Sequence, residues 1–313
     1  MDRKFQPGIA ILLLQILSSI FAKKSIAARE TLTKAFIQYF QNQGHLEGSA
    51  LIKARFDHSI NHNIPLEDIA RFECGSAVAA LSNTSPACFW LVYHLYSNDR
   101  ILEECREELT RLVSNVSFVT EDGVAKAVRT LDLTNIKATC PILSSTFQEV
   151  LRMHSVGVSA RLVMQDHLLD GRYLLKKGGI VMIPGPVQHT SSAAFGPSVE
   201  SFDHRRFLPG EQMPNPVAFR AFGGGTTQCP GRHFATTEIL AFAALMVLRC
   251  DVKPASGKWV CPTTHGAGSW EITPMPDFDI DVTITPRSGA EKSEWKVVIT
   301  DSDKRSTSSA ENM

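Results

Sequence analysis

The sequence has no excess of charge of either sign. Its 313 residues include 32 lysines and arginines against 32 aspartates and glutamates. Nothing in this balance indicates a polyanion-binding protein. Hydrophobic residues make up 43% of the chain, enough for a substantial core in one or two domains.

Closely spaced cysteine pairs are also lacking. The cysteines are odd in number and widely spaced, with no C-x-x-C pair, at positions 74, 88, 105, 140, 229, 250 and 261. This pattern argues against a disulfide framework or a zinc module and favours a reducing compartment. Only Cys229 has a chemical context, and we expect the others to pack as small hydrophobic residues. There is no internal repeat and no flavin or nicotinamide fingerprint.

The pattern of apolar residues predicts a mainly helical chain with a small β region. Helices are expected over residues 23–40, 66–90, 97–114, 132–154 and 231–249. Short strands are expected over residues 158–163, 168–173 and 180–183, with Asp170-Gly171 as a hairpin turn, and strand-like segments within 270–284. Loops dominate residues 184–225. We expect one domain over residues 1–287 and a polar, disordered tail over 288–313.

Two of these helices carry further signals. Pro65 and the acids after it are typical of a helix start, so they mark the beginning of the long apolar helix 66–90. The helix 97–114 is amphipathic, and its glutamates are expected to face water beside Arg106 and Arg111 as solvated surface pairs. These glutamates are Glu103, Glu104, Glu107 and Glu108.

One cysteine lies between a glycine-rich loop and a helix start. The stretch reads Phe222-Gly-Gly-Gly-Thr-Thr-Gln-Cys229-Pro-Gly231-Arg232. Glycines adopt positive φ and let the backbone approach a flat ligand closely. The helix that begins near Gly231 directs its free amides and positive dipole end at Cys229, which favours a thiolate. A loop thiolate among small and apolar residues suits an axial bond to haem iron. The alternative is a glycine turn ahead of a buried structural cysteine.

The spacing Phe-x-x-Gly-x-x-x-Cys-x-Gly resembles the signature of the cytochrome P-450 family, the haem-thiolate monooxygenases. The resemblance covers about residues 23–285 and implies the C-terminal portion of the cytochrome P-450 fold. It also implies haem (iron protoporphyrin IX) as the cofactor, with Cys229 as the metal ligand. Phe222, Gly223 and Gly231 are then expected to contact the haem.

A second motif follows from the family pattern. Glu149 and Arg152 lie three residues apart on one helix face, where they can pair, in an apolar helix followed by strands. In the family this pair is completed by a loop arginine before the cysteine, and Arg206 stands in the matching place with Arg205 as its neighbour. The resemblance therefore implies a buried structural triad of Glu149, Arg152 and Arg206.

Three further positions bear on haem retention. Arg161 resembles the family arginine that pairs with a haem propionate, and the alternative is a surface strand arginine. His189 is expected to be a hydrogen-bonding structural residue. Thr227 departs from the pattern, because many relatives carry arginine or histidine two residues before the cysteine as another propionate partner.

The middle of the long helix 66–90 contains another departure. Thr84 matches the threonine of relatives that activate oxygen, while Asn83 occupies the place of their acid. A carboxylate can relay protons, whereas a neutral amide can only orient water or a hydroxyl. Pro86 is expected to kink the helix there. We predict catalytic roles for Thr84 and Asn83; the alternative is a purely structural kink.

The resemblance does not reach the N-terminal part of the family fold. Under this resemblance the chain is expected to begin just ahead of the long helix, and the strand near Val158 is expected to have an unpaired edge. Residues 8–22 form an apolar run that is short for a membrane span. We expect a buried or membrane-facing helix there, with a short anchor as the alternative. The family location is the cytoplasmic face of the endoplasmic reticulum, but the usual anchor is absent from the pattern.

The resemblance implies a monooxygenase that inserts one oxygen atom from dioxygen into an apolar organic substrate, in secondary-metabolite biosynthesis. Its branch includes sterol and bile-acid hydroxylases, a prostacyclin-type isomerase and many fungal enzymes. Ala79, Ala80 and Phe89 are expected to shape the substrate pocket. An NADPH-dependent reductase is the expected electron donor and docks near Arg232. The alternatives are a haem-dependent peroxide isomerase or dehydratase, and a truncated non-catalytic remnant.

Overall fold

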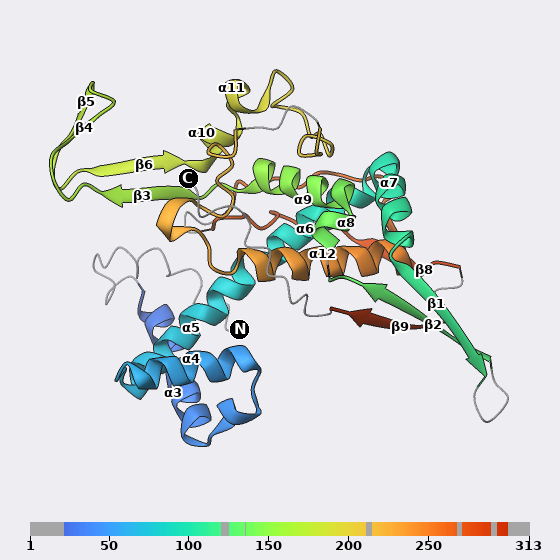
Figure 1. Cartoon of the computed structure of the whole chain (residues 1–313), viewed down its shortest axis with the longest axis horizontal. Coiled ribbons are helices and arrows are strands. Elements are labelled where there is room, and N and C mark those ends of the chain that lie inside the picture. The colour runs from blue at the N-terminus through green and yellow to red at the C-terminus, as the bar shows by residue number, and fades with distance from the viewer. Residues whose placement is uncertain are drawn as a thin grey trace. The chain divides into compact units, whose positions relative to one another are not determined.

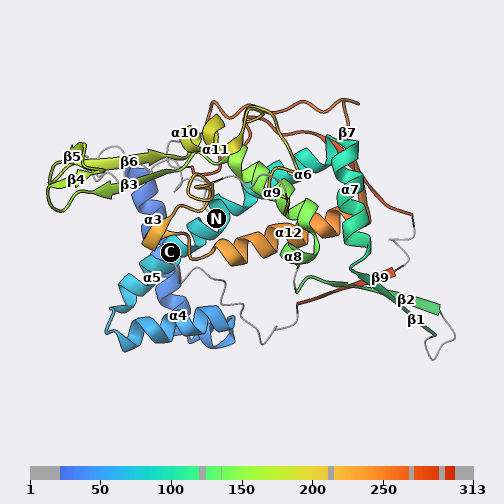
Figure 2. The same ribbon diagram turned by 45° about the horizontal axis from the view of Figure 1, so that its top comes forward.

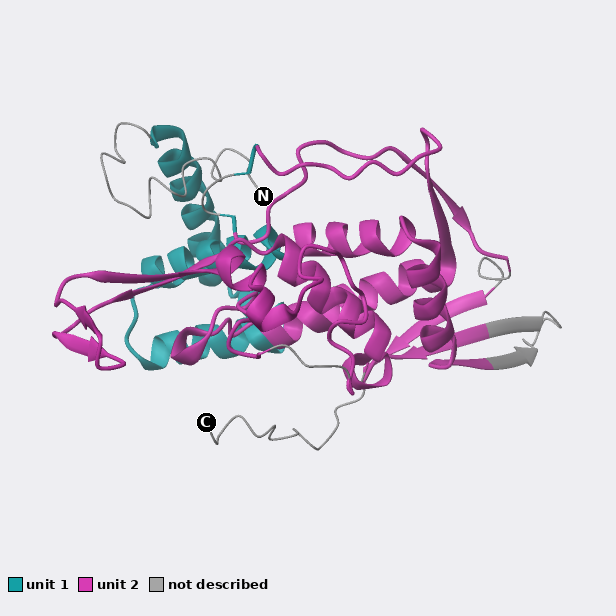
Figure 3. Ribbon diagram, turned by 90° about the horizontal axis from the view of Figure 1, so that it is seen from above, with its two compact units in different colours: residues 1–83, 266–271 teal, residues 84–265, 272–313 magenta. Residues whose placement is uncertain are grey.

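The computed structural model describes residues 22–119, 125–134, 136–210, 215–267, 271–288 and 293–299. Within these ranges the chain forms two compact units, coloured separately in Figure 3. The first unit contains the described residues up to Asn83 and part of the segment 266–271, and the second contains the rest. The boundary between the two units falls after Asn83, within the long helix predicted over residues 66–90; the single domain over residues 1–287 stays a prediction.

The first unit is helical. It comprises α3 (Lys23–Gln41), the 3-10 helix η2 (Gly44–Glu47), α4 (Ala50–Asn61) and α5 (Leu66–Ser82). Here α3 packs against α5, and the Thr33 hydroxyl lies 3.7 Å from the Cys74 sulfur between them. Pro65 is the N-cap of α5, as predicted.

The long apolar helix predicted over residues 66–90 is two helices. α5 ends at Ser82, Asn83 is its C-cap, and α6 runs from Thr84 to Tyr96. The physical reason is Pro86, which has no amide hydrogen to donate to the carbonyl of Ser82 four residues earlier. The expected kink is thus a break, and it lies three residues before the proline.

The second unit is built on four longer helices: α6, α7 (Asp99–Thr110), α9 (Pro141–His154) and α12 (Arg232–Arg249). Figures 1 and 2 show α6 and α9 alongside α12, and all three helices pack against one another. Trp90, Leu143 and Leu240 are fully buried in the core between them. Burial of such apolar surfaces supplies most of the stabilisation of a helical unit.

The expectation that the glutamates of α7 face water was wrong for Glu108. Its side chain is 6% exposed, and its carboxylate accepts hydrogen bonds from the amides of Ile142 and Leu143 at 2.9–3.1 Å. α9 has no side-chain cap of its own, so Glu108 caps it from the neighbouring helix. Burial raises the pKa of Glu108 above its usual value.

A three-stranded sheet extends the second unit, with strand order β1 (Val113–Val119), β2 (Ala125–Asp132) and β9 (Ser293–Val298). β1 and β2 are antiparallel, and β2 and β9 are parallel. The helix predicted over residues 97–114 ends earlier, at Thr110, because β1 begins at Val113. β9 lies within the tail that was expected to be disordered, and its Trp295 ring lies 5.5 Å from the Arg129 guanidinium on β2.

Two ribbons lie on the other side of the helices. β3 (Val158–Leu162) pairs with β6 (Ile180–Pro184), and β4 (His167–Leu169) pairs with β5 (Tyr173–Leu175) through the predicted turn at Asp170-Gly171. Both turn residues have positive φ, 52° and 65°, as a type I′ hairpin requires. Figure 1 shows the β4–β5 hairpin at the far end of the β3–β6 ribbon.

Within the described ranges, β3 and β6 pair only with each other. The outer edge of this ribbon is therefore unpaired within these ranges, as expected.

Short helices interrupt the expected loop region: α10 (Gly185–His189), α11 (Ser192–Phe195) and the 3-10 helix η3 (Gly225–Thr227). After α12, β7 (Cys250–Pro254) pairs with β8 (Val282–Pro286). α8 (Ile136–Thr139) precedes α9.

The apolar run at residues 8–22 lies outside the described residues, apart from Ala22. Among the helices that the structure does describe, none combines the length and the apolar character needed to cross a bilayer.

Candidate functional site

Cys229 is presented by a closed loop. Its amide donates a 2.9 Å hydrogen bond to the carbonyl of Phe222, and the amide of Gly223 bonds to the carbonyl of Arg220. Gly223 and Gly225 have φ of 74° and 65°, values that residues with a Cβ rarely adopt. Cys229 is half-buried and makes no disulfide. The loop therefore holds one accessible sulfur in a fixed backbone frame.

The loop leads directly into α12. Gly231 is the N-cap of this helix with φ −82°, so a positive φ is not what glycine supplies there. A Cβ on Gly231 would lie 3.8 Å from the Cys229 sulfur, so its absence leaves space beside the sulfur. The guanidinium of Arg232 donates to the carbonyl of Cys229 at 3.1 Å, which ties the helix start to the loop.

The structure brings Glu149, Arg152 and Arg206 together. Arg152 donates to both oxygens of Glu149, at 2.7 and 2.8 Å, and Nε of Arg206 lies 3.1–3.2 Å from the same two oxygens. The amide of Asp203 completes the set at 3.0 Å. Glu149 is fully buried, and these donors satisfy a carboxylate that water cannot reach.

The two arginines use their remaining donors on backbone carbonyls. Arg152 reaches the carbonyl of His189, and Arg206 reaches those of Phe195 and Ser198. The triad thereby holds the segment between β6 and the cysteine loop against α9. Arg205 takes no part in the triad and pairs with Glu104 on α7 at 2.9 Å.

His189 links this triad to the cysteine loop. The amide of Arg220 donates to Nε2 of His189 at 2.9 Å, so the imidazole is neutral and carries its proton on Nδ1. Burial, with the neighbouring Arg152 charge, lowers the pKa of His189 to about 4. Sequence reasoning anticipated a structural histidine but not its partner, which is 31 residues away.

Arg161 lies at the tip of the cysteine loop. Its Nη2 donates to the carbonyl of Gly224 at 3.2 Å and to the hydroxyl of Thr227. Thr227 is the position where many relatives carry a cation. Here it accepts a hydrogen bond from Arg161, so the two positions complement each other. The guanidinium is exposed and can also meet an external carboxylate.

The two predicted catalytic residues flank the helix break. Thr84 is the first residue of α6, and Asn83 caps α5, with its amide donating to the Ser82 hydroxyl at 3.3 Å. α6 packs against α12, the helix that follows Cys229. The catalytic roles of Thr84 and Asn83 stay predictions, as do the pocket roles of Ala79, Ala80 and Phe89.

A small hollow of about 200 Å³ lies beside the cysteine loop. Phe147, Phe222 and Leu240 form part of its apolar wall, and Lys137 and His233 are among its polar lining residues. Desolvation lowers the pKa of His233, and the charges of Arg232 and Lys137 lower it further. The volume of this hollow is below the ~300–1,000 Å³ of typical small-molecule sites.

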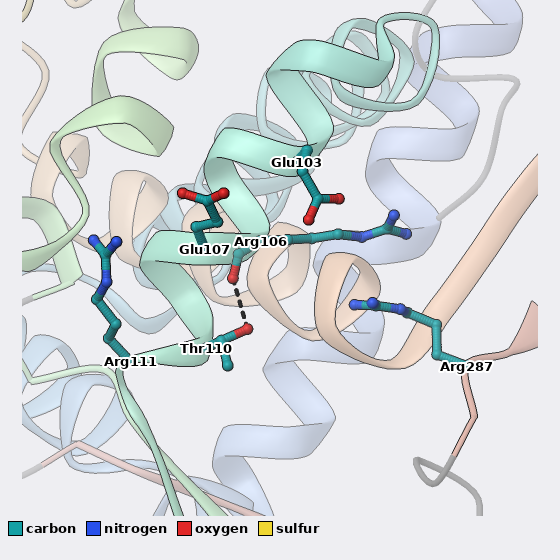
Figure 4. Close-up of a pocket in the computed structure, with 6 residues that line it drawn as sticks. All are labelled: Glu103, Arg106, Glu107, Thr110, Arg111 and Arg287. Atoms are coloured by element: carbon teal, nitrogen blue, oxygen red, sulfur yellow. Dashed lines mark hydrogen bonds between the residues drawn. The ribbon is translucent and has the colours of Figure 1, made fainter.

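A larger hollow of about 440 Å³ lies along α7 and is drawn in Figure 4. Its lining is charged and comes from α7, its C-terminal end and the residue after β8: Glu103, Arg106, Glu107, Thr110, Arg111 and Arg287. Asp251 neutralises part of this charge, because Arg106 lies 2.6 Å and Arg287 3.8 Å from its carboxylate. None of the predicted site residues lines this hollow.

Comparison with known proteins identifies similar chains. The family model described as Cytochrome P450 matches residues 14–276. The chain is 33% identical over 310 residues to "Cytochrome P450 monooxygenase nodJ" of Hypoxylon pulicicidum, covering 96% of this chain and 60% of that protein. It is 28% identical over 218 residues to cholesterol 7-alpha-monooxygenase of Cricetulus griseus, covering 64% and 42%.

Solved structures show the same fold. Retinoic acid bound cyanobacterial CYP120A1 superposes with a TM-score of 0.68 at 23% identity, over 91% of this chain and 62% of that one. The cytochrome P450DA heme domain gives a TM-score of 0.66 at 19% identity, over 93% and 61%. The chain therefore spans about three fifths of the length of these relatives.

Proposed function

Because the chain belongs to the cytochrome P450 family, we propose that it is a haem-thiolate monooxygenase in which the Cys229 thiolate would hold the haem iron. The observation that carries this proposal is the closed loop from Phe222 to Cys229, which presents one half-buried sulfur at the start of α12. Haem is the cofactor of the family. When bound, it supplies the activation of dioxygen and the transfer of one oxygen atom to the substrate.

The residues around Cys229 fit a haem. Among the described residues, no group of three or more His, Cys, Asp or Glu side chains is placed to hold a metal ion. This agrees with haem, whose porphyrin ring supplies most of the iron's ligands, so that the protein needs to supply only the Cys229 sulfur. Beside the loop, Nε of Arg220 is buried and has no hydrogen-bond partner among the described residues, and the Arg161 guanidinium is exposed. Both suit the carboxylates of a haem.

Each residue then has a separate task. Cys229 holds the cofactor, and Arg161 binds a propionate. The triad of Glu149, Arg152 and Arg206 keeps the loop in place through His189 and does no chemistry itself. The Thr84 hydroxyl would hold a water molecule by a hydrogen bond, and the Asn83 amide would orient that water.

The substrate is an apolar organic molecule of secondary metabolism. Two observations support this: a relative named as a fungal monooxygenase covers 96% of the chain, and another relative is named for cholesterol hydroxylation. Ala79, Ala80 and Phe89 then shape the apolar pocket.

Electrons come from an NADPH-dependent reductase. The cations Lys137 and Arg232 line the small hollow beside the cysteine loop and suit an acidic partner surface. Because this hollow lies beside the cysteine loop, electrons would enter on the side of the Cys229 sulfur. We propose the cytoplasmic face of the endoplasmic reticulum as the location.

The test is the absorption spectrum of the reduced, carbon-monoxide-bound chain. We expect a far-red-shifted Soret band that Cys229→Ser abolishes and Cys250→Ser retains. Cys250 is a matched control, because it is another half-buried free cysteine. Absence of the band in the wild-type chain, with no haem taken up, would identify a non-catalytic remnant.

A second measurement separates the reaction types. A monooxygenase needs the reductase, NADPH and dioxygen for every turnover. Conversion of a fatty hydroperoxide without NADPH would instead identify a haem-dependent isomerase or dehydratase, and would overturn the proposal even where the Soret band is present.

A further inference from the structure

Two arginines meet at one glycine of the cysteine loop. Arg161 reaches Gly224 from β3 and donates to its carbonyl at 3.2 Å. Arg220 approaches the same glycine from the chain just before the loop: a Cβ built on Gly224 would lie 3.2 Å from its Cζ and would collide with its Nη1. The glycine therefore leaves room for the Arg220 side chain.

The Arg220 guanidinium has no partner of its own. Its Nε is buried without a hydrogen bond, and among the described residues the guanidinium forms no ion pair or hydrogen bond. A buried donor without an acceptor costs free energy, and two guanidiniums at one residue repel each other. Both costs disappear when a carboxylate lies between the two side chains.

Two hydrogen bonds fix the backbone of Arg220. Its amide donates to Nε2 of His189, and its carbonyl accepts from Gly223. Since His189 is tied to the buried triad through Arg152, the Arg220 backbone is held by contacts on both sides. The side chain is thus presented from a fixed point.

We infer that Arg220 and Arg161 together bind one propionate carboxylate of the haem, with Arg220 supplying the cation that position 227 lacks. This inference rests on the proposed function. Thr227 fits the scheme because it is neutral and its hydroxyl accepts a hydrogen bond from Arg161. Many relatives carry an arginine two residues before the cysteine. In this chain Arg220, nine residues before Cys229, would take its place.

The test compares two ligands on the full-length chain. Hemin carries two free propionates, and hemin dimethyl ester carries none. We expect Arg220→Gln to weaken hemin binding by about 10- to 100-fold, the range for a charge-assisted hydrogen bond, while ester binding changes little. Arg161→Gln should act in the same direction. Arg172→Gln, which removes an exposed arginine of the β4–β5 turn, should leave both affinities unchanged.

A second variant, Gly224→Ala, keeps the charge of Arg220 but shifts its guanidinium. Gly224 has φ −174°, an extended conformation open to any residue, so Gly224→Ala is tolerated by the backbone. Its methyl group would displace the Arg220 guanidinium. We expect the same selective loss of hemin affinity, and Gly224→Ala serves as the test if Arg220→Gln does not fold.

The outcomes separate the two proposals. If the wild-type chain binds hemin through Cys229 and both Arg220→Gln and Gly224→Ala bind hemin and its ester as the wild type does, the shared carboxylate site is wrong and the haem function stands. If the wild-type chain takes up no hemin, the proposed function itself fails.

Discussion

Nε2 of His94 and Nε2 of His154 lie 2.9 Å apart in the interior of the second unit. His94 stacks on Phe202 with ring centres 3.9 Å apart, and His154 stacks on Trp90 at the same distance. In this contact one imidazole donates a hydrogen bond and the other accepts it. Burial lowers the pKa of His94 to about 4 and that of His154 to about 3.

This pair makes stability depend on pH. In the unfolded chain each histidine takes up a proton near pH 6.5, whereas in the folded chain it does so only near pH 4 or below. Between these values the unfolded state binds more protons, so the free energy of unfolding falls as the pH falls. The loss is about 1.4 kcal/mol per pH unit for each histidine. Urea titrations between pH 7.5 and 5 measure it.

The control is a histidine outside the core. His94→Gln removes one of the buried titrating groups and should reduce the pH slope by about one proton. His167→Gln, at an exposed position on β4, should leave the slope as it is. Equal slopes for wild type and His94→Gln would contradict the account. Trp90 fluorescence reports the same event locally, because its ring stacks on His154.

Neighbouring arginines should differ sharply in their effect on folding. Arg206→Ala leaves the buried Glu149 with an uncompensated charge and should cost about 3–5 kcal/mol of unfolding free energy. Arg205→Ala removes an ion pair with Glu104 that is 43% exposed on the arginine side, and should cost at most about 1 kcal/mol. Denaturant midpoints of the two variants measure the contrast, and similar losses would exclude a special role for Arg206.

Adjacent glutamates of α7 give a second matched pair. Glu108→Ala leaves the amides of Ile142 and Leu143 without their acceptor and should cost about 1–3 kcal/mol. Glu107→Ala, at an exposed position, should change stability by no more than about 0.5 kcal/mol. Thermal unfolding of both variants tests whether α9 depends on this cap.

The cationic rim near the cysteine loop should govern the rate of reduction. Lys137→Glu reverses an exposed charge beside the small hollow and should slow electron transfer from an acidic reductase several-fold at low ionic strength. Salt should reduce the difference, because it screens exposed charges. Lys176→Glu on the β4–β5 hairpin is the control. Stopped-flow reduction measures both, and an equal effect of the two changes would place the reductase elsewhere.

Local sequence was sufficient where the structure depends on local chemistry. The turn at Asp170-Gly171 follows from two residues that tolerate positive φ, and the start of α5 follows from Pro65. The glycine-rich loop and the helix after it were predicted in the same way. The triad was predicted only through its resemblance to a family pattern, since Glu149 and Arg206 lie 57 residues apart.

Sequence patterns failed where a distant residue decides the outcome. Glu107 and Glu108 are adjacent in an amphipathic helix, and its pattern predicts that both are exposed. Only the packing of α9 against this helix buries Glu108. β9 was missed because a short polar strand becomes stable only beside β2.

The sequence by itself determined that Cys229 lies in a glycine loop ahead of a helix, because spacing and backbone freedom are properties of adjacent residues. The family resemblance also directed attention to Arg161 and Thr227, which the fold joins by a hydrogen bond. Only the tertiary structure decided that Glu108 caps α9, that His189 supports the loop, and that Arg220 joins Arg161 at Gly224. These are contacts between segments that the fold brings together, and their energies depend on burial that no local pattern specifies.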